Sequence, residues 1–353
     1  MGQATAEAPD VSVIVCHHTN RLIDRCLDSI RLSVGVTYEV IVITSDDTYS
    51  TKDAEVYFLE DGPAGKRNLG AKYAKGNLLV FLDDDVEISP YCLYEFKVWM
   101  EEHPTCGMAF GRIYKMAEGR RQELDDCGSW LTWTGFLFAR AQNRVRDCAQ
   151  FNAPVRILAS KSATCSIRRS TFQLAGRFDA DYFILGEETD LAWRVWLSGL
   201  EVWYVPTAVS WHAFGCFELK PKNNFYTIER TMTYGCRNYL SMLWTNLGTW
   251  RLLLTFPTHL CAWLCAALGF CASGDANRGM AIMRGMSEFC HNLPDLQRKR
   301  HRVQSNRVVS DQVLFQSIYY SPRFSYYLKR MWRYWNTQLH GVILLGFLLT
   351  AST

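Results

Sequence analysis

The chain has 353 residues, of which 48% are hydrophobic and 21% charged, and its formal net charge is +3. These values exclude an intrinsically disordered or collagen-like chain and are typical of a globular protein. The length allows two domains, or one large domain with an appendage.

Thirteen cysteines are scattered along the sequence, and no two of them form a Cys-x-x-Cys pair. This spacing indicates neither a zinc site nor a disulfide framework, so we expect reduced thiols in a cytosolic compartment. The polar N-terminus, Met1 to Asp10, has no apolar region of the kind found in secretory signals. We therefore expect the first domain to remain in the cytoplasm.

The first 75 residues alternate between strand and helix patterns. Short apolar runs predict strands, and apolar residues at intervals of three and four predict helices. The predicted strands are 11–15, 39–43 and 55–59, and the predicted helices are 20–33 and 66–74, the second after a break at 62–65. This alternation favours a doubly wound α/β domain with a mostly parallel sheet and right-handed crossovers.

A fourth strand is predicted over residues 78–86, and it ends in three consecutive carboxylates, Asp83, Asp84 and Asp85. The carboxyl ends of strands in an open α/β sheet are where ligands bind. Adjacent carboxylates repel one another unless a cation lies among them, and hard oxygen ligands suit Mg²⁺ or Mn²⁺ carrying phosphate. The alternative is an ordinary solvated acidic turn.

The middle of the chain gives a second acidic segment after a stretch without clear periodicity. The predicted elements are a helix over 90–102, a strand over 108–114, strands within 155–167 and 201–205, a helix over 170–175, and a strand over 209–212. Glu187 and Glu188 begin a predicted helix that continues to Ser198, where the helix dipole favours acids. Asp190 and Arg194 have the spacing of an i,i+4 ion pair, which alone would explain both residues.

Four sequence blocks together resemble the family 2 glycosyltransferases with a GT-A fold, which include bacterial rhamnosyl- and galactosyltransferases of surface glycans. They occur in the family's order within residues 11–215, and are 11–15, 62–70 with 76–86, 168–179, and 186–194 followed by Pro206 and His212. The resemblance implies a catalytic GT-A domain over residues 1–220, with a Rossmann-like sheet. It also implies an inverting transfer from a nucleotide-diphosphate sugar donor.

The resemblance assigns metal and phosphate roles to several residues. Asp85 resembles the metal-binding aspartate of the family motif, and His212 resembles its distal metal ligand for Mn²⁺ or Mg²⁺. Asp83 would approach the donor's ribose. Arg67 and Arg194 are placed to meet phosphate or base, since arginine suits bidentate contacts.

The resemblance also implies a general base in the second acidic segment. The family usually has Glu-Asp at this point, and the aspartate takes the proton of the acceptor hydroxyl. Here the pair is Glu187-Glu188, so Glu188 takes that place with one extra methylene, and Glu187 stands beside it.

The segments that usually hold the nucleotide base depart from the family pattern. The first strand is followed by Cys16-His17-His18-Thr19-Asn20, and Thr44 stands where the family has an acid after the second strand. We expect His18, Asp46 and Asp84 to contact the donor. A polar loop without a donor contact is the alternative for His17-His18.

The region 221–353 is predicted to be helical and associated with a membrane. An amphipathic helix is predicted over 224–247. The following stretch, residues 252–274, contains no Asp, Glu, Lys or Arg and is long enough to span a bilayer. A full crossing would place 275–338, with eleven Lys or Arg against four acids, outside the cell, contrary to the positive-inside tendency. We therefore expect this segment to re-enter or lie on the anionic, cytoplasmic face, while 342–349 is too short to span. The alternative is a soluble helical subdomain that uses the same apolar faces as a lid or a dimer interface.

These observations favour an inverting, metal-dependent glycosyltransferase acting on a lipid-linked glycan or glycolipid. We expect no nucleic-acid partner, and a homo-oligomer is compatible with the sequence. A sugar-phosphate nucleotidyltransferase is one alternative, but it would need a glycine-rich loop after the first strand. A non-catalytic, membrane-tethered binding module on a transferase scaffold is the other.

Overall fold

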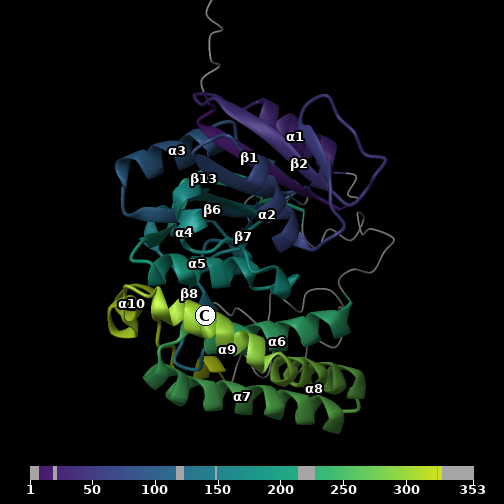
Figure 1. Cartoon of the computed structure of the whole chain (residues 1–353), viewed down its shortest axis with the longest axis vertical. Coiled ribbons are helices and arrows are strands. Elements are labelled where there is room, and N and C mark those ends of the chain that lie inside the picture. Colours follow the sequence, from purple (N-terminus) through teal and green to yellow (C-terminus); the bar gives the residue numbers. More distant parts are fainter. Residues whose placement is uncertain are drawn as a thin grey trace, which may run out of the picture.

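A computed structural model describes residues 8–18, 22–116, 123–147, 149–213, 227–323 and 325–327. Several parts of the predicted elements lie outside these ranges, namely the tail up to residue 7, residues 19–21 before the first helix, 224–226, and the apolar stretch 342–349. Figure 1 shows a sheet with flanking helices in one half of the molecule and stacked helices in the other.

The N-terminal half of the sheet is parallel, as predicted. Its strands are β1 (Val11–His17), β2 (Tyr38–Thr44), β3 (Glu55–Phe58) and β4 (Leu78–Asp83), in the spatial order β4-β1-β2-β3. Helices α1 (Ile23–Arg31) and α2 (Pro63–Tyr73) make the connections. Cys16 pairs in register with Asp83, so the carboxyl ends of β1 and β4 lie side by side.

Two predicted boundaries in this half are wrong. Helix α2 begins at Pro63 rather than Lys66, because proline has no N–H to leave unpaired and its φ suits the first turn of a helix. The acidic strand ends at Asp83. A turn carries Asp84 and Asp85, and β5 (Val86–Ile88) pairs antiparallel with β13 (Glu201–His212).

The rest of the main sheet mixes directions. Its strands are β6 (Cys106–Lys115), β7 (Glu123–Asp126), β10 (Gln142–Arg146), β11 (Val155–Arg156), β12 (Thr164–Arg168) and β13 (Glu201–His212), while β8 (Ser129–Leu131) and β9 (Leu137–Ala139) form a small second sheet. β12 lies antiparallel between β4 and β6, whereas β13 runs parallel to β6. The two strands predicted over 201–212 are one strand, with a register shift between Val205 and Val209 where Pro206 cannot donate to the ladder.

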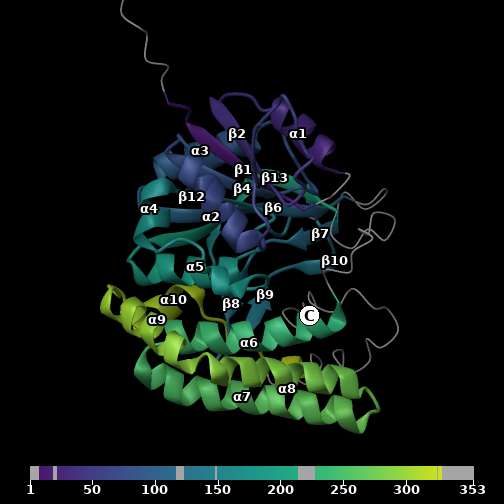
Figure 2. The same ribbon diagram turned by 45° about the vertical axis from the view of Figure 1, so that its right-hand side comes forward.

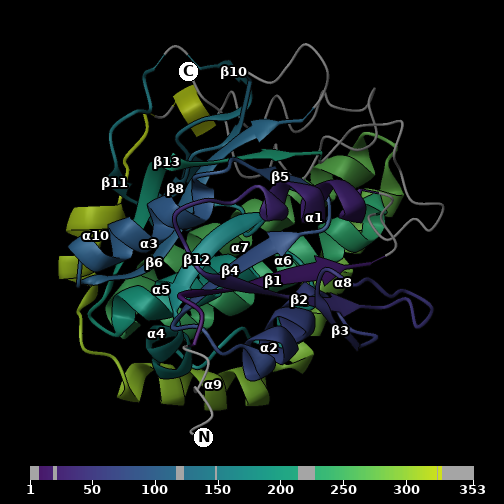
Figure 3. The ribbon, with the colours of Figure 1, turned by 90° about the horizontal axis from the view of Figure 1, so that it is seen from above.

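Helices cover both faces of this sheet (Figure 3). One face packs on α1 and α3 (Cys92–Glu102), and the other on α2, α4 (Arg169–Leu174) and α5 (Glu187–Leu197). Alternation along β1 divides the two cores, because Val13 and Val15 face α1 and α3 while Ile14 faces the opposite side.

The C-terminal region is a stack of helices beneath α5 (Figure 2). It consists of α6 (Ile228–Asn246), α7 (Thr249–Ala272), α8 (Ala276–His291), α9 (Leu293–Ser305) and α10 (Asp311–Ile318). Met242 and Leu243 of α6 belong to the same apolar core as Trp193 of α5. The core is therefore continuous across the predicted boundary at residue 220, which itself falls outside the described residues.

Candidate functional site

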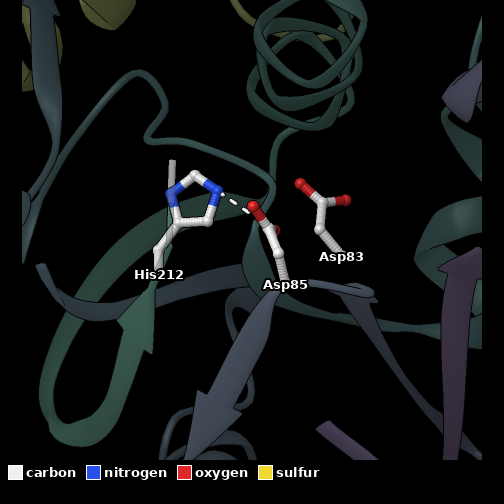
Figure 4. A group of neighbouring side chains, drawn as sticks. All are labelled: Asp83, Asp85 and His212. Atoms are coloured by element: carbon white, nitrogen blue, oxygen red, sulfur yellow. Dashed lines mark ion pairs between the residues drawn. The ribbon is translucent and has the colours of Figure 1, made fainter. Parts of the chain in front are cut away.

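Two aspartates and one histidine meet at the carboxyl ends of β4 and β13 (Figure 4). Asp83 ends β4, Asp85 lies in the turn that follows, and His212 is the last residue of β13. The antiparallel register places His212 opposite Val86, directly beside Asp85. One ligand atom from each of the three side chains lies within 4.8 Å of the other two.

The imidazole of His212 lies between two carboxylates. Its Nε2 is 3.4 Å from Oδ1 of Asp85, and its Nδ1 is 2.9 Å from Oδ2 of Asp125, whose other oxygen accepts from Nζ of Lys161 at 2.7 Å. Burial alone would lower the pKa of His212, but Asp85 and Asp125 outweigh it and raise that pKa to about 10. Burial would raise the pKa of Asp125, but Lys161 and His212 hold it well below the usual value.

This donor set fits Mg²⁺ or Mn²⁺. The carboxylates of Asp83 and Asp85 lie beside the imidazole of His212, and two carboxylates with an imidazole are donors that Mn²⁺ accepts. Asp125 would keep its hydrogen bond to Nδ1 and leave Nε2 for a metal, the arrangement usual around histidine ligands.

A buried arginine joins this group to helix α5. Arg67 is 1% exposed; its Nη2 donates to Oδ1 of Asp83 at 2.9 Å and its Nη1 to Oε1 of Glu187 at 2.8 Å. Helix α2 presents Arg67 one turn after its proline start. The predicted arginine thus lies in the site, and its guanidinium couples Asp83 to the second acidic segment.

The two glutamates at the start of α5 differ in environment. Glu187 is 4% exposed and held by the ion pair with Arg67. Glu188 is half-buried and accepts a long 3.4 Å bond from Oγ1 of Thr189. Burial, together with the neighbouring Glu187 carboxylate, raises the pKa of Glu188 well above its usual value. A carboxylate with a raised pKa is a stronger proton acceptor than an ordinary glutamate.

Of the other residues predicted to contact the donor, some lie beside the metal-binding group and one does not. The backbone N–H of His18 donates to Oδ2 of Asp84 at 2.9 Å, so these two residues meet beside the metal-binding group. Asp46 lies after β2 and its side chain accepts from the hydroxyl of Thr48. Arg194 is not brought into the group, because it donates to Asp190 at 2.7 Å and to the carbonyl of Ala175. The simple ion-pair interpretation of Asp190 and Arg194 is confirmed.

Sequence reasoning missed Asp125 and Lys161. Both lie in stretches where the pattern gave little: Asp125 in the region without periodicity, and Lys161 before β12. A buried carboxylate that orients a histidine has no signature in sequence spacing, since its partner His212 is 87 residues away.

Thr44, which stands where the family has an acid after the second strand, contacts a residue at the end of β1. Its hydroxyl lies 2.9 Å from Nδ1 of His17, and the His17 ring lies 4.4 Å from the ring of Tyr49. The two unusual residues at the ends of β1 and β2 therefore contact each other.

Comparison with known proteins agrees with this geometry. Residues 12–164 match the model "Glycosyl transferase family 2". Polypeptide N-acetylgalactosaminyltransferase 11 from Xenopus tropicalis is 23% identical over 239 residues, which cover 59% of this chain and 39% of the relative. The chain thus spans about two-fifths of the length of that curated relative.

Two solved structures share the fold. A crystal structure of GalNAc-T7 with UDP, GalNAc and Mn²⁺ is 15% identical, with a TM-score of 0.53, and the match covers 82% of this chain and 58% of that one. Residues 1–349 of S. aureus TarS, in complex with UDP-GlcNAc, are 15% identical, with a TM-score of 0.53 and coverages of 84% and 88%. The chain is thus similar to the family 2 glycosyltransferases over residues 12–164, and it has the GT-A fold of the glycosyltransferases that it resembles.

Proposed function

We propose that the protein is an inverting, metal-dependent glycosyltransferase that moves a sugar from a nucleoside-diphosphate donor to a hydroxyl group. The observation that carries this proposal is the convergence of Asp83, Asp85 and His212, with Arg67 joining them to the segment of Glu188. Two of the similar proteins are described with a uridine nucleotide, one of them also with Mn²⁺, which supports a nucleotide donor here.

Each residue has a distinct role in the proposed reaction. Asp85 and His212 would hold Mn²⁺ or Mg²⁺, which supplies positive charge for the diphosphate, and Asp83 would face the donor ribose. The acceptor oxygen attacks the anomeric carbon while the bond from that carbon to the diphosphate oxygen breaks. Glu188 takes the proton from the acceptor hydroxyl, and the nucleoside diphosphate leaves as an anion.

The other residues predicted to contact the donor are proposed to have different roles. His18 and Asp84 are already in contact beside the metal-binding group, which supports a shared role toward the donor. Asp46 is proposed as a donor contact from the end of β2. Arg194 is proposed to act by holding Asp190 on α5, since its donors are used there.

We propose that the acceptor is borne by a membrane and that α7 rests on the cytoplasmic face. Among the described helices, α7 alone is long and apolar enough to span a bilayer by length and composition. It lies flat on the outside of the molecule (Figure 2), with Trp250 81%, Leu254 69% and Leu268 68% exposed. Its opposite face buries Trp263 against α6 and α8, and the buried His259 has its Nδ1 2.9 Å from the carbonyl oxygen of Thr134. One apolar face with a packed, partly polar back favours a helix in the interface plane over a spanning one.

Two alternatives receive less support. A nucleotidyltransferase would use a phosphate loop after β1, whereas His17 and His18 stand there. A binding module without catalysis would not need a half-buried glutamate with a raised pKa beside a metal-binding group. A third alternative concerns the exposed face of α7, which would pack against a second copy of the chain instead of a membrane. Binding to lipid vesicles distinguishes these two roles.

The proposal is tested by turnover of a panel of sugar nucleotides with Mn²⁺, in the presence of a membrane-lipid extract. Release of nucleoside diphosphate and transfer of labelled sugar to the lipid fraction are measured. We expect one donor to be consumed and its sugar to appear in lipid. In parallel reactions with added pyrophosphate, release of a sugar 1-phosphate together with formation of a nucleoside triphosphate would instead identify a nucleotidyltransferase.

A further inference from the structure

The segment that leads into Glu187 and Glu188 has an unusual backbone. Phe183 and Leu185 have φ of 58° and 73°, and Gly186, the N-cap residue directly before α5, has φ of 88°. Residues with side chains rarely adopt positive φ, and such conformations persist only where the surroundings hold them. The 182–186 segment thus depends on contacts from elsewhere in the chain.

Helix α6 of the C-terminal region supplies those contacts. Asn238 is 4% exposed, and its Nδ2 donates to the carbonyl oxygens of Tyr182, Ile184 and Leu185 at 3.0, 2.7 and 2.8 Å. The two N–H bonds of a single amide are thereby shared among three backbone acceptors of the irregular segment, and the carbonyl of Tyr182 also accepts from the backbone N–H of Ile184.

The neighbouring arginine fixes the orientation of that amide. Nε of Arg237 donates to Oδ1 of Asn238 at 2.9 Å, which directs the NH₂ group toward the segment. Nη2 of Arg237 donates to the carbonyls of Asp181 and Tyr182 at 2.9 and 3.1 Å. Two adjacent residues of α6 therefore donate hydrogen bonds to four carbonyls of one short segment, those of Asp181, Tyr182, Ile184 and Leu185.

The same helix also holds Asp190, two residues after Glu188. Asn246 lies eight residues after Asn238, about two turns along the same face. Its Nδ2 donates to Oδ1 of Asp190 at 2.7 Å. Helix α6 therefore contacts the chain on both sides of Glu188.

Helix α9 makes a further contact near this segment, because Nζ of Lys299 forms an ion pair with Asp179 at 2.7 Å.

We infer that the C-terminal helices position the candidate base, and that Asn238 is a positioning residue which holds the 182–186 segment and so sets the location of Glu188. The inference rests on the proposed function for its catalytic meaning. The helical region is then part of the catalytic machinery as well as a membrane-facing layer.

Hydrogen–deuterium exchange of the full chain tests the structural half of this inference. Asn238→Ala should speed exchange of the amides of Phe183 and Ile184, which bond within the segment, by tenfold or more. Thr245→Ala is the matched control, because Thr245 is a buried residue of the same helix whose hydroxyl bonds only to α6 carbonyls. Faster exchange confined to 180–190 supports the inference. Unchanged exchange there, or an equal increase over the whole chain, would overturn it.

Kinetics test the catalytic half. Asn238→Ala should lower kcat 10- to 100-fold while the KM for donor changes less than threefold, and Thr245→Ala should change neither. If Asn238→Ala does not fold, Arg237→Lys is used, because lysine keeps the charge and lacks the Nε that orients Asn238. A loss confined to KM would overturn the positioning role. If exchange changes locally as expected but the protein turns over no sugar nucleotide, the proposed function is contradicted, and the role of Asn238 in holding the 182–186 segment still stands.

Discussion

Oδ2 of Asp125 lies 2.9 Å from Nδ1 of His212, and this contact determines which nitrogen of the ring faces Asp85. Lys161 holds Asp125 from the other side at 2.7 Å. The metal-binding group therefore includes a supporting carboxylate whose removal should loosen the histidine without removing any ligand.

Asp125→Asn should lower affinity for Mn²⁺ by 10- to 100-fold, because the amide no longer fixes the ring and leaves Lys161 without its ion pair. Titration calorimetry with Mn²⁺ measures this. The control is Asp126→Asn: Asp126 is also buried but accepts from the backbone of Gly128. Equal Mn²⁺ affinity in Asp125→Asn and wild type would show that Asp125 does not support the site.

Arg67→Met should destabilise the fold by about 3–5 kcal/mol, since it leaves the carboxylate of Glu187 buried without its partner. Urea unfolding gives the free energy. The matched surface change is Arg31→Met, whose pairs with Asp28 and Asp53 are largely exposed, and it should cost under about 1 kcal/mol. Similar costs for the two variants would contradict the buried ion-pair account.

Glu188→Gln should reduce kcat about 10²- to 10⁴-fold, on the order of 3–5 kcal/mol of barrier, with little change in donor affinity. The glutamine keeps the shape but removes the proton acceptor. Glu187→Gln is the informative comparison, because it weakens the ion pair with Arg67 and should act mainly on stability. Inactive Glu187→Gln beside active Glu188→Gln would move the base by one residue.

The raised pKa of Glu188 predicts two opposite pH effects. Turnover should rise with pH through that pKa, above the usual glutamate range, because the base must be deprotonated. Stability should change the other way. The folded state binds the proton more tightly than the unfolded state, so this contribution is present at low pH and lost as pH rises through the folded pKa. Glu188→Gln should remove both effects, and an acidic limb at the ordinary glutamate pKa would contradict the burial argument.

Leu254→Glu and Leu268→Glu should reduce co-sedimentation of the full chain with vesicles containing anionic lipid, because both side chains lie on the exposed face of α7. Val308→Glu, an exposed apolar residue outside α7, is the control. Binding that is unchanged in both α7 variants would remove the membrane role of this face. Loss of a dimer in these variants, with no vesicle binding by wild type, would identify it as an interface between copies.

The sequence was informative where the physical signal is local. Apolar runs and helical spacing predict the parallel half of the sheet and place the acids after residue 82 at a ligand-binding edge. The metal roles of Asp85 and His212 come from the resemblance to the family 2 glycosyltransferases. The mixed half of the sheet was harder to predict, because a short strand such as β11 is defined by pairing with the distant strand β13 rather than by its own sequence pattern.

The contacts that complete the site were beyond sequence reasoning. Arg67 was expected to meet the donor, and only the fold shows that it pairs with Asp83 and Glu187. Asn238 lies in an ordinary amphipathic helix, and its bonds to residues more than 50 positions earlier leave no pattern in the sequence. Side chains that hold irregular backbone are found from packing, not from periodicity.

The most direct test of the account is nucleotide-sugar binding with and without divalent metal. Thermal shifts are recorded for a panel of UDP-, GDP- and dTDP-sugars, in Mn²⁺ and in EDTA, with wild type and Asp85→Asn. We expect at least one sugar nucleotide to raise the Tm of the wild type in Mn²⁺ only, and to have no such effect on Asp85→Asn. An equal Tm shift in EDTA, or the same Mn²⁺-dependent shift in Asp85→Asn, would contradict the metal-dependent donor site.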